Sequence, residues 1–167
     1  VFEVMACHQD PAVPRVEVTV APGISAFQAA AAKAGAPIGH DFCTISLSDL
    51  LTPWEVIERR LKAAAEGDFV VAFYNPKSQR RTSQIVRAME ILAARRPPDT
   101  PVVIASSLGR PEECIRVRPL SAFDPDEVDM LTLVMVGSSE TRVLETGDGK
   151  TWVYTPRGYE KKREAAE

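Results

Sequence analysis

The most constraining feature of the sequence is a strand–helix–strand block near its middle. Residues 69–74, Phe-Val-Val-Ala-Phe-Tyr, are apolar without alternation, which is typical of a strand covered on both faces. A helical pattern with Ile85, Met89 and Leu92 on one face follows, and Val102–Ala105 forms a second apolar run. Strand, helix and strand within about 35 residues predict a βαβ unit, in which a right-handed crossover joins two parallel strands.

The segment before this block predicts further alternation of helices and strands. Phe2, Met5 and Ala6 fall on one face of a helix that has no polar lead-in, so we expect the chain to begin inside an element of a longer protein. Strands are expected at Val16–Val20 and Phe42–Leu47, and a helix at Ala26–Ala34. Ser25 is the expected N-cap of that helix, and Gly35 is its expected end.

A helix that begins near Thr52 has the clearest start signals in the chain. Thr52 and Glu55 predict a capping box, and Leu51 can pack on Val56 as a hydrophobic staple. Pro53 suits the first helical position. The expected apolar stripe and the glycine that ends the helix are Ile57, Leu61, Ala64 and Gly67.

The chain after residue 113 predicts strands rather than helices. They are expected at residues 114–118, 131–136, 142–146 and 151–155. The last two flank Gly147-Asp148-Gly149-Lys150, which is typical of a hairpin turn. We therefore predict an α/β fold with flanking helices and a mixed, mostly parallel sheet, which is parallel at its centre and has antiparallel additions.

Charge and cysteine usage exclude several classes of protein. A net charge of −3 argues against a general nucleic-acid or anionic-membrane binder, because such proteins need an excess of cations. No apolar run approaches the roughly 20 residues of a membrane span. Cys7, Cys43 and Cys114 form no CxxC pair, and the only histidines are His8 and His40. We therefore expect no metal site, and a cytoplasmic protein with reduced, mostly buried thiols.

Special residues gather in the loops that follow predicted strands. In open α/β sheets such loops bind ligands, and small residues there let a ligand approach the backbone. Turn geometry uses the same residue types, but four such loops together favour a ligand cleft. They are residues 22–25, 74–78, 106–110 and 137–139. The sequence has no Gly-rich phosphate loop, GxSxG elbow or HExxH motif.

Three cations, Lys77, Arg80 and Arg81, lie at or just before the start of a predicted helix. The helix dipole disfavours cations at that position. A solvated cluster is one interpretation, but three cations against the dipole indicate an anionic ligand. Arg110 and Arg157 are possible partners, because guanidinium groups suit carboxylates and phosphates equally.

Four motifs, in this order, resemble those of the tetrapyrrole methylase family. They are Pro22-Gly23-Ile24-Ser25-Ala26, Phe73-Tyr74-Asn75-Pro76-Lys77-Ser78, Val128-Asp129-Met130-Leu131-Thr132 and Thr155-Pro156-Arg157-Gly158-Tyr159. The first is shared widely in the family. The second and fourth are narrower, and resemble the branch that methylates precorrin-3B and contracts its ring in cobalamin biosynthesis. The resemblance runs from Val1 to about Lys161, which is nearly the whole chain.

The resemblance implies a methyltransferase dependent on S-adenosylmethionine (SAM), with the donor and a tetrapyrrole bound between two α/β domains. Residues 1–39 would end the first domain, 40–160 would form the second, and 161–167 a disordered tail. The residues expected at the donor are Ser25, Ala26, Tyr74, Asn75, Thr132 and Leu133. The cations expected at the precorrin carboxylates are Lys77, Arg80, Arg81, Arg110 and Arg157. A homodimer is also expected from the family.

Two departures from the family pattern bear on function. The family's Gly-Pro-Gly loop and its Ser-Gly-Asp-Pro segment, which contributes to the donor site, would both precede Val1. We therefore expect this chain alone to bind SAM poorly or not at all, and to be inactive as an enzyme. The loop Leu108–Glu113 also differs from the family pattern, although it keeps Arg110.

Other functions stay open at this point. Another member of the family would carry similar motifs, either a different precorrin methylase or a ribosomal-RNA ribose methylase, although an RNA enzyme would need more positive charge. A non-catalytic binding or dimerisation module is the alternative from a different class. No residue is assigned as the acid or base of ring contraction, for which His8, His40 and Tyr74 are candidates.

Overall fold

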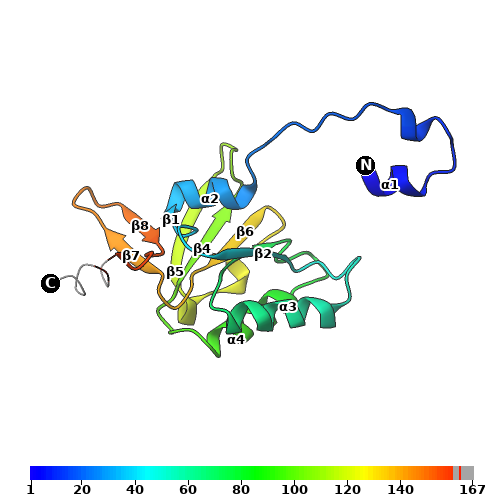
Figure 1. Ribbon diagram of the computed structural model, residues 1–167. Helices are drawn as coiled ribbons and strands as arrows, with labels where there is room; N and C mark the ends of the chain where they lie inside the picture. Colours follow the sequence, from blue (N-terminus) through cyan, green and yellow to red (C-terminus); the bar gives the residue numbers. More distant parts are fainter. Residues whose placement is uncertain (160–161, 163–167) are drawn as a thin grey trace.

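A five-stranded sheet carries the fold of the computed structural model, which describes residues 1–159 and 162 (Figure 1). In spatial order its strands are β2 (Phe42–Ser46), β3 (Val70–Tyr74), β6 (Thr132–Val136), β4 (Pro101–Ser106) and β5 (Cys114–Pro119). β2 runs parallel to β3, whereas β6 is antiparallel to both β3 and β4, and β5 is antiparallel to β4. The expected α/β class, with a mixed sheet and flanking helices, is confirmed.

The position of β6 corrects one expectation. β3 and β4 are parallel, as predicted, and α4 (Ser83–Ala93) lies between them in the sequence, but β6 separates them in the sheet. The expectation of a mostly parallel sheet is wrong, because β3 and β4 each pair with β6 in the antiparallel sense. A run of apolar residues marks a buried strand without fixing its direction, so the pattern could not reveal this pairing.

The strands send alternate side chains into two hydrophobic clusters on opposite faces of the sheet. On one face, Val71 and Phe73 pack with the buried residues of α3 (Trp54–Glu66) and α4. On the other face, Val70 and Ala72 pack with three buried alanines of α2 (Ala26–Ala34). Helix α2 therefore packs in the same body as the strands. The division into domains at residue 39 stays a prediction, and its predicted tail lies outside the described residues except for Lys162.

A second, three-stranded sheet packs beside α2. In it, β8 (Thr151–Tyr154) pairs antiparallel with β7 (Arg142–Glu145) and parallel with β1 (Gly35–Ala36). The hairpin predicted around residues 147–150 is confirmed. Gly35 ends α2 with a φ of 131°, and a Cβ there would lie 2.5 Å from the Val153 carbonyl oxygen, so this junction requires glycine.

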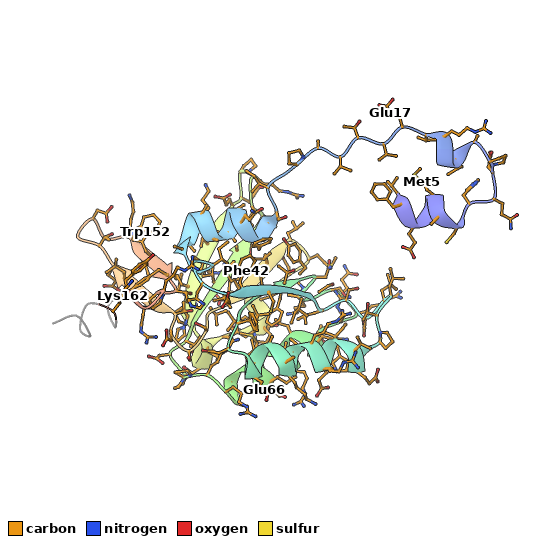
Figure 2. All side chains as sticks on the ribbon, in the orientation of Figure 1. Met5, Glu17, Phe42, Glu66, Trp152 and Lys162 are labelled. Atoms are coloured by element: carbon orange, nitrogen blue, oxygen red, sulfur yellow. The ribbon has the colours of Figure 1, made fainter. Side chains whose placement is uncertain are left out.

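The first 25 residues extend away from this body (Figure 1). The predicted opening helix is confirmed as α1 (Phe2–Cys7), and a 3₁₀ turn follows at Val13–Arg15. The strand predicted at Val16–Val20 is wrong: this segment, marked by Glu17 in Figure 2, pairs with no strand in the described part of the chain. Alternation shows that a segment suits a strand, but strand structure also requires a neighbouring strand.

Helix α3 starts differently from the prediction. Its N-cap is Pro53 and makes no side-chain capping bond, so the capping box predicted for Thr52 and Glu55 is not formed. Leu51 is 92% exposed, so the predicted staple is absent as well. The predicted stripe is confirmed, because its members are buried: Ile57, Leu61 and Ala64.

Among the described residues, no helix is long and apolar enough to cross a membrane.

The three cysteines are free thiols, but the expectation that they are mostly buried is wrong. Cys7 and Cys114 are exposed, since one lies on the N-terminal extension and the other on the edge strand β5. Cys43 is half-buried against the core, and this burial raises the pKa of its thiol.

A buried arginine fixes the end of the sheet where β3 begins and β6 ends. Arg96 is 5% exposed, and its guanidinium donates to the carbonyl oxygens of Phe69 and Gly137, which flank those two strands. Burial lowers the pKa of this guanidinium to about 10, an effect that nearby Asp68 opposes. Arg96 therefore satisfies two strand-end carbonyls at a substantial desolvation cost.

We predict that Arg96→Met lowers the free energy of unfolding by about 2 kcal/mol, because buried carbonyl groups lose their donor. The measurement is urea unfolding at neutral pH. Arg95→Met is the matched control, since Arg95 is exposed, and it should change stability little. Equal effects of the two substitutions would show that the Arg96 contacts do not stabilise the sheet.

Candidate functional site

A pocket of about 220 Å³ lies where β3 and β4 end and β6 begins. We call it the strand-end pocket. It brings together five of the six residues predicted at the donor: Ala26, Tyr74, Asn75, Thr132 and Leu133. The sixth, Ser25, is the exposed N-cap of α2, adjacent to Ala26, and its backbone N–H donates to Gln28 Oε1 at 2.9 Å. Segments from four parts of the chain thus meet at one point.

Tyr74 joins helix α2 to the end of β3. Its hydroxyl oxygen accepts a hydrogen bond from the backbone N–H of Phe27 at 3.2 Å, in the first turn of α2. Asn75 then turns the chain with a φ of 49°, a left-handed conformation that asparagine tolerates. Its side-chain Nδ2 donates to Ser46 Oγ at 3.2 Å, at the end of β2. The pocket wall formed by Tyr74 and Asn75 is therefore fixed from both sides.

Thr132 and Asp129 shape the start of β6. The Thr132 hydroxyl donates to Asp129 Oδ1 at 2.6 Å and lies 3.0 Å from Ser106 Oγ at the end of β4. Asp129 Oδ1 also accepts from the Leu131 backbone N–H at 2.9 Å. Because this network holds the turn, the side chains of Met130 and Leu131 stay 58% and 50% exposed at the pocket. Exposed apolar side chains beside a fixed backbone suit contact with a flat ligand ring.

The loop after β4 closes another side of the strand-end pocket. Glu113 Oε2 accepts from the Gly109 backbone N–H at 2.8 Å, and Glu113 Oε1 pairs with Lys33 of α2 at 2.8 Å. The Gly109 N–H, and then Lys33, lower the pKa of the Glu113 carboxyl below its ordinary 4.5. Arg110 lines the pocket from this loop, and its guanidinium has no partner among the residues the structure describes.

The five predicted substrate cations do not converge. Arg110 alone lines the strand-end pocket, while Arg81 is not part of its lining and donates to the Asn75 carbonyl oxygen at 2.9 Å. Lys77 points elsewhere, to the Pro125 carbonyl oxygen at 2.8 Å and Asp126 at 3.0 Å. Arg80 is exposed on the surface. The cations before α4 are thus held in part by the chain's own acceptors, and their roles as substrate ligands stay predictions.

Arg157 lies in a different pocket, of about 560 Å³, beside the β7–β8 hairpin. We call this the hairpin pocket.

Among the candidates for proton transfer, Tyr74 lines the strand-end pocket, whereas His8 and His40 do not. Both imidazoles instead accept local backbone N–H groups, from Asp10 and Asp41, respectively.

Residues 7–124 match the family described as Tetrapyrrole (Corrin/Porphyrin) Methylases. The chain belongs to the tetrapyrrole methylase family. The match covers more than half of the chain, including the strand-end residues from Ala26 to Arg110. The family expected from the four motifs is therefore confirmed.

Two similar curated proteins are named as C(17)-methyltransferases. A precorrin-3B C(17)-methyltransferase from Sinorhizobium sp is 51% identical over 144 residues, covering 86% of this chain and 57% of that protein. A probable cobalt-factor III C(17)-methyltransferase from Salmonella typhimurium is 50% identical over 144 residues, covering 86% of this chain and 58% of its own length. The chain thus spans little more than half the length of these relatives.

A solved structure supports the same family and fold. The crystal structure of the methyltransferase CobJ matches with a TM-score of 0.83 at 46% identity, over 93% of this chain and 62% of that one. A cobalt precorrin-4 methyltransferase shares the fold, with a TM-score of 0.60 at 20% identity. Mixed α/β architecture is therefore common to this chain and to solved methyltransferases.

Several residues at the strand-end pocket were not predicted from the sequence. Met130 and Leu131 line it although they were not predicted at the site, and Asp129 and Glu113 hold its loops. Met130 and Leu131 lie in a motif that was recognised, and their apolar character next to Thr132 was the available signal. Nothing in the sequence pattern pairs Glu113 with Gly109, because that contact depends on the turn geometry.

We predict that the Glu113 carboxyl titrates below its ordinary pKa of 4.5. Its contribution to the loop is then complete above pH 4.5 and is lost as the pH falls through the lowered pKa. The Gly109 N–H is the larger cause, so Lys33→Met should leave the pKa still lowered. An NMR titration of the Glu113 side chain measures this directly. An ordinary pKa in the unmodified chain would contradict the described loop.

Proposed function

We propose that this chain is part of a SAM-dependent methyltransferase that methylates C17 of precorrin-3B and contracts its ring in cobalamin biosynthesis. The observation that carries the proposal is the strand-end pocket, which gathers five of the six residues expected at the donor. Relatives named for precorrin-3B and for cobalt-factor III match at 51% and 50% identity. Both names specify C17 methylation, and cobalt-factor III is the alternative ring substrate.

The geometry supports a donor bound along the edge of the pocket. Thr132 and Leu133 would hold the adenine through backbone groups, with Met130 and Leu131 against its faces. Tyr74, Asn75 and Ala26 would contact the rest of the donor from the opposite wall. A pocket of about 220 Å³ is smaller than the roughly 300–1,000 Å³ typical of ligand pockets. These residues would therefore enclose the donor only in part, and we expect weak binding by this chain alone.

Methyl transfer at this site depends on alignment of the donor methyl group with the ring carbon that attacks it. SAM supplies a methyl group already activated on a sulfonium, and a ring carbon of the tetrapyrrole is the nucleophile. The contribution of the pocket is to fix the donor, and effective molarities of well-aligned groups can reach the order of 10⁵ M. The fixed turn at Asn75 and the Asp129–Thr132 network suit this role, because they leave the pocket wall little freedom.

Substrate charge complements the cation at the pocket. A precorrin carries several carboxylates, so a protein with a net charge of −3 must present local cations to it. Arg110 is placed for this role, because it lines the pocket and its guanidinium lacks a partner within residues 1–159 and 162. A charge-assisted hydrogen bond to one carboxylate would orient the ring toward the donor.

We expect a cytoplasmic homodimer that acts on a small-molecule tetrapyrrole without nucleic acid or membrane. The acidic net charge supports the exclusion of nucleic acid. The homodimer rests on the resemblance to the family.

We predict that Ala26→Leu weakens binding of S-adenosylhomocysteine (SAH) by at least about fivefold, because overpacking a contact typically costs about 1–3 kcal/mol. Ala32→Leu makes the same change at an exposed position of the same helix and is the matched control. NMR or calorimetric titration gives both affinities. If the two variants bind SAH alike, the donor does not lie against Ala26, and this placement of the donor fails.

A further inference from the structure

The hairpin pocket lies at the opposite end of the sheet from the strand-end pocket. β6 begins at Thr132, in the strand-end pocket, and the chain reaches Glu140, in the hairpin pocket, only after β6 has ended. The same separation holds for α2, which starts at Ala26 and leads to Gly39 on the other side. A five-residue strand spans roughly 17 Å. The core of the sheet therefore separates the two pockets.

The hairpin pocket has the size of a ligand site. Its volume of about 560 Å³ falls within the roughly 300–1,000 Å³ typical of small-molecule pockets. Its base is preformed, because the buried Thr155 hydroxyl donates to the Pro37 carbonyl oxygen and lies 2.9 Å from Thr141 Oγ1. Two tyrosines, Tyr154 and Tyr159, and Pro156 also line the pocket.

Two arginines supply the charge of this pocket. Arg142 is held in place, since its Nη1 donates to the carbonyl oxygens of Ser139 at 3.0 Å and Thr141 at 3.2 Å. Its other two guanidinium nitrogens have no partner among the described residues, and neither has the guanidinium of Arg157. Glu140 also lines the pocket. Two guanidinium groups in a pocket that is also lined by tyrosine rings match a ring that carries carboxylates.

We infer that the hairpin pocket is a second binding site, separate from the strand-end pocket, for a flat ring that bears carboxylates. The assignment of the ring to the tetrapyrrole class rests on the proposed function. The pocket itself rests only on the geometry. A ring bound here would not be methylated, because the residues expected at the donor lie at the far end of the sheet. The site would instead hold a substrate or product ring away from the reaction.

The test is a calorimetric titration of the chain with uroporphyrin, a planar tetrapyrrole that carries eight carboxylates. We expect Arg157→Gln to weaken uroporphyrin binding on the order of tenfold, through loss of one charge-assisted contact. The fold should survive, because the Arg157 side chain has no partner in the described structure. Arg60→Gln removes the same charge from an exposed position of α3 and should leave binding unchanged.

Measurement of SAH affinity distinguishes a failure of this inference from a failure of the proposed function. Affinity for SAH should be the same with and without bound uroporphyrin, and the same in Arg157→Gln as in the unmodified chain. Weakening of uroporphyrin binding by Arg157→Gln alone supports the second site even if SAH does not bind. Absent uroporphyrin binding, or equal weakening by Arg60→Gln, would overturn the inference.

Discussion

Burial of β6 between β3 and β4 is the constraint on which the rest of the structure depends. All five residues of β6 are buried, and it pairs antiparallel with a neighbour on each side. Because β6 runs against those neighbours, its first residue meets their last residues, as in the pairing of Thr132 with Ser106. The strand-end pocket follows from that direction. Arg96 stabilises the opposite end, where its guanidinium bridges the carbonyls that flank β3 and β6.

Much of this architecture could be predicted, because local patterns reflect local physics. The apolar runs of β3 and β4, the periodicity of α4 and the turn between β7 and β8 all depend on neighbours in sequence. The position of β6 between β3 and β4 could not be predicted, since an apolar run has the same appearance in either strand direction. The missing strand at residues 16–20 has a related cause, because strand structure requires a neighbouring strand that the local pattern does not supply.

The candidate site also contains some residues that could be predicted from the sequence and others that could not. Tyr74, Asn75 and Thr132 were predicted from motifs and are brought together, since they respectively end, follow and begin a central strand. The cations were less predictable. Lys77 and Arg81 were expected to bind a ligand anion at the start of α4, but they contact acceptors of the chain itself. Charge in a sequence shows that an acceptor is needed, and only the fold shows whether that acceptor is internal.

The proposed function requires the donor to bind where β3 and β4 end and β6 begins. Backbone amide shifts of the isotope-labelled chain, followed during titration with SAH, test it most directly. We expect the largest changes on Ala26, Tyr74, Asn75, Thr132 and Leu133, even if affinity is weak. Changes centred instead on Thr155–Tyr159, or no changes at saturating SAH, would contradict it.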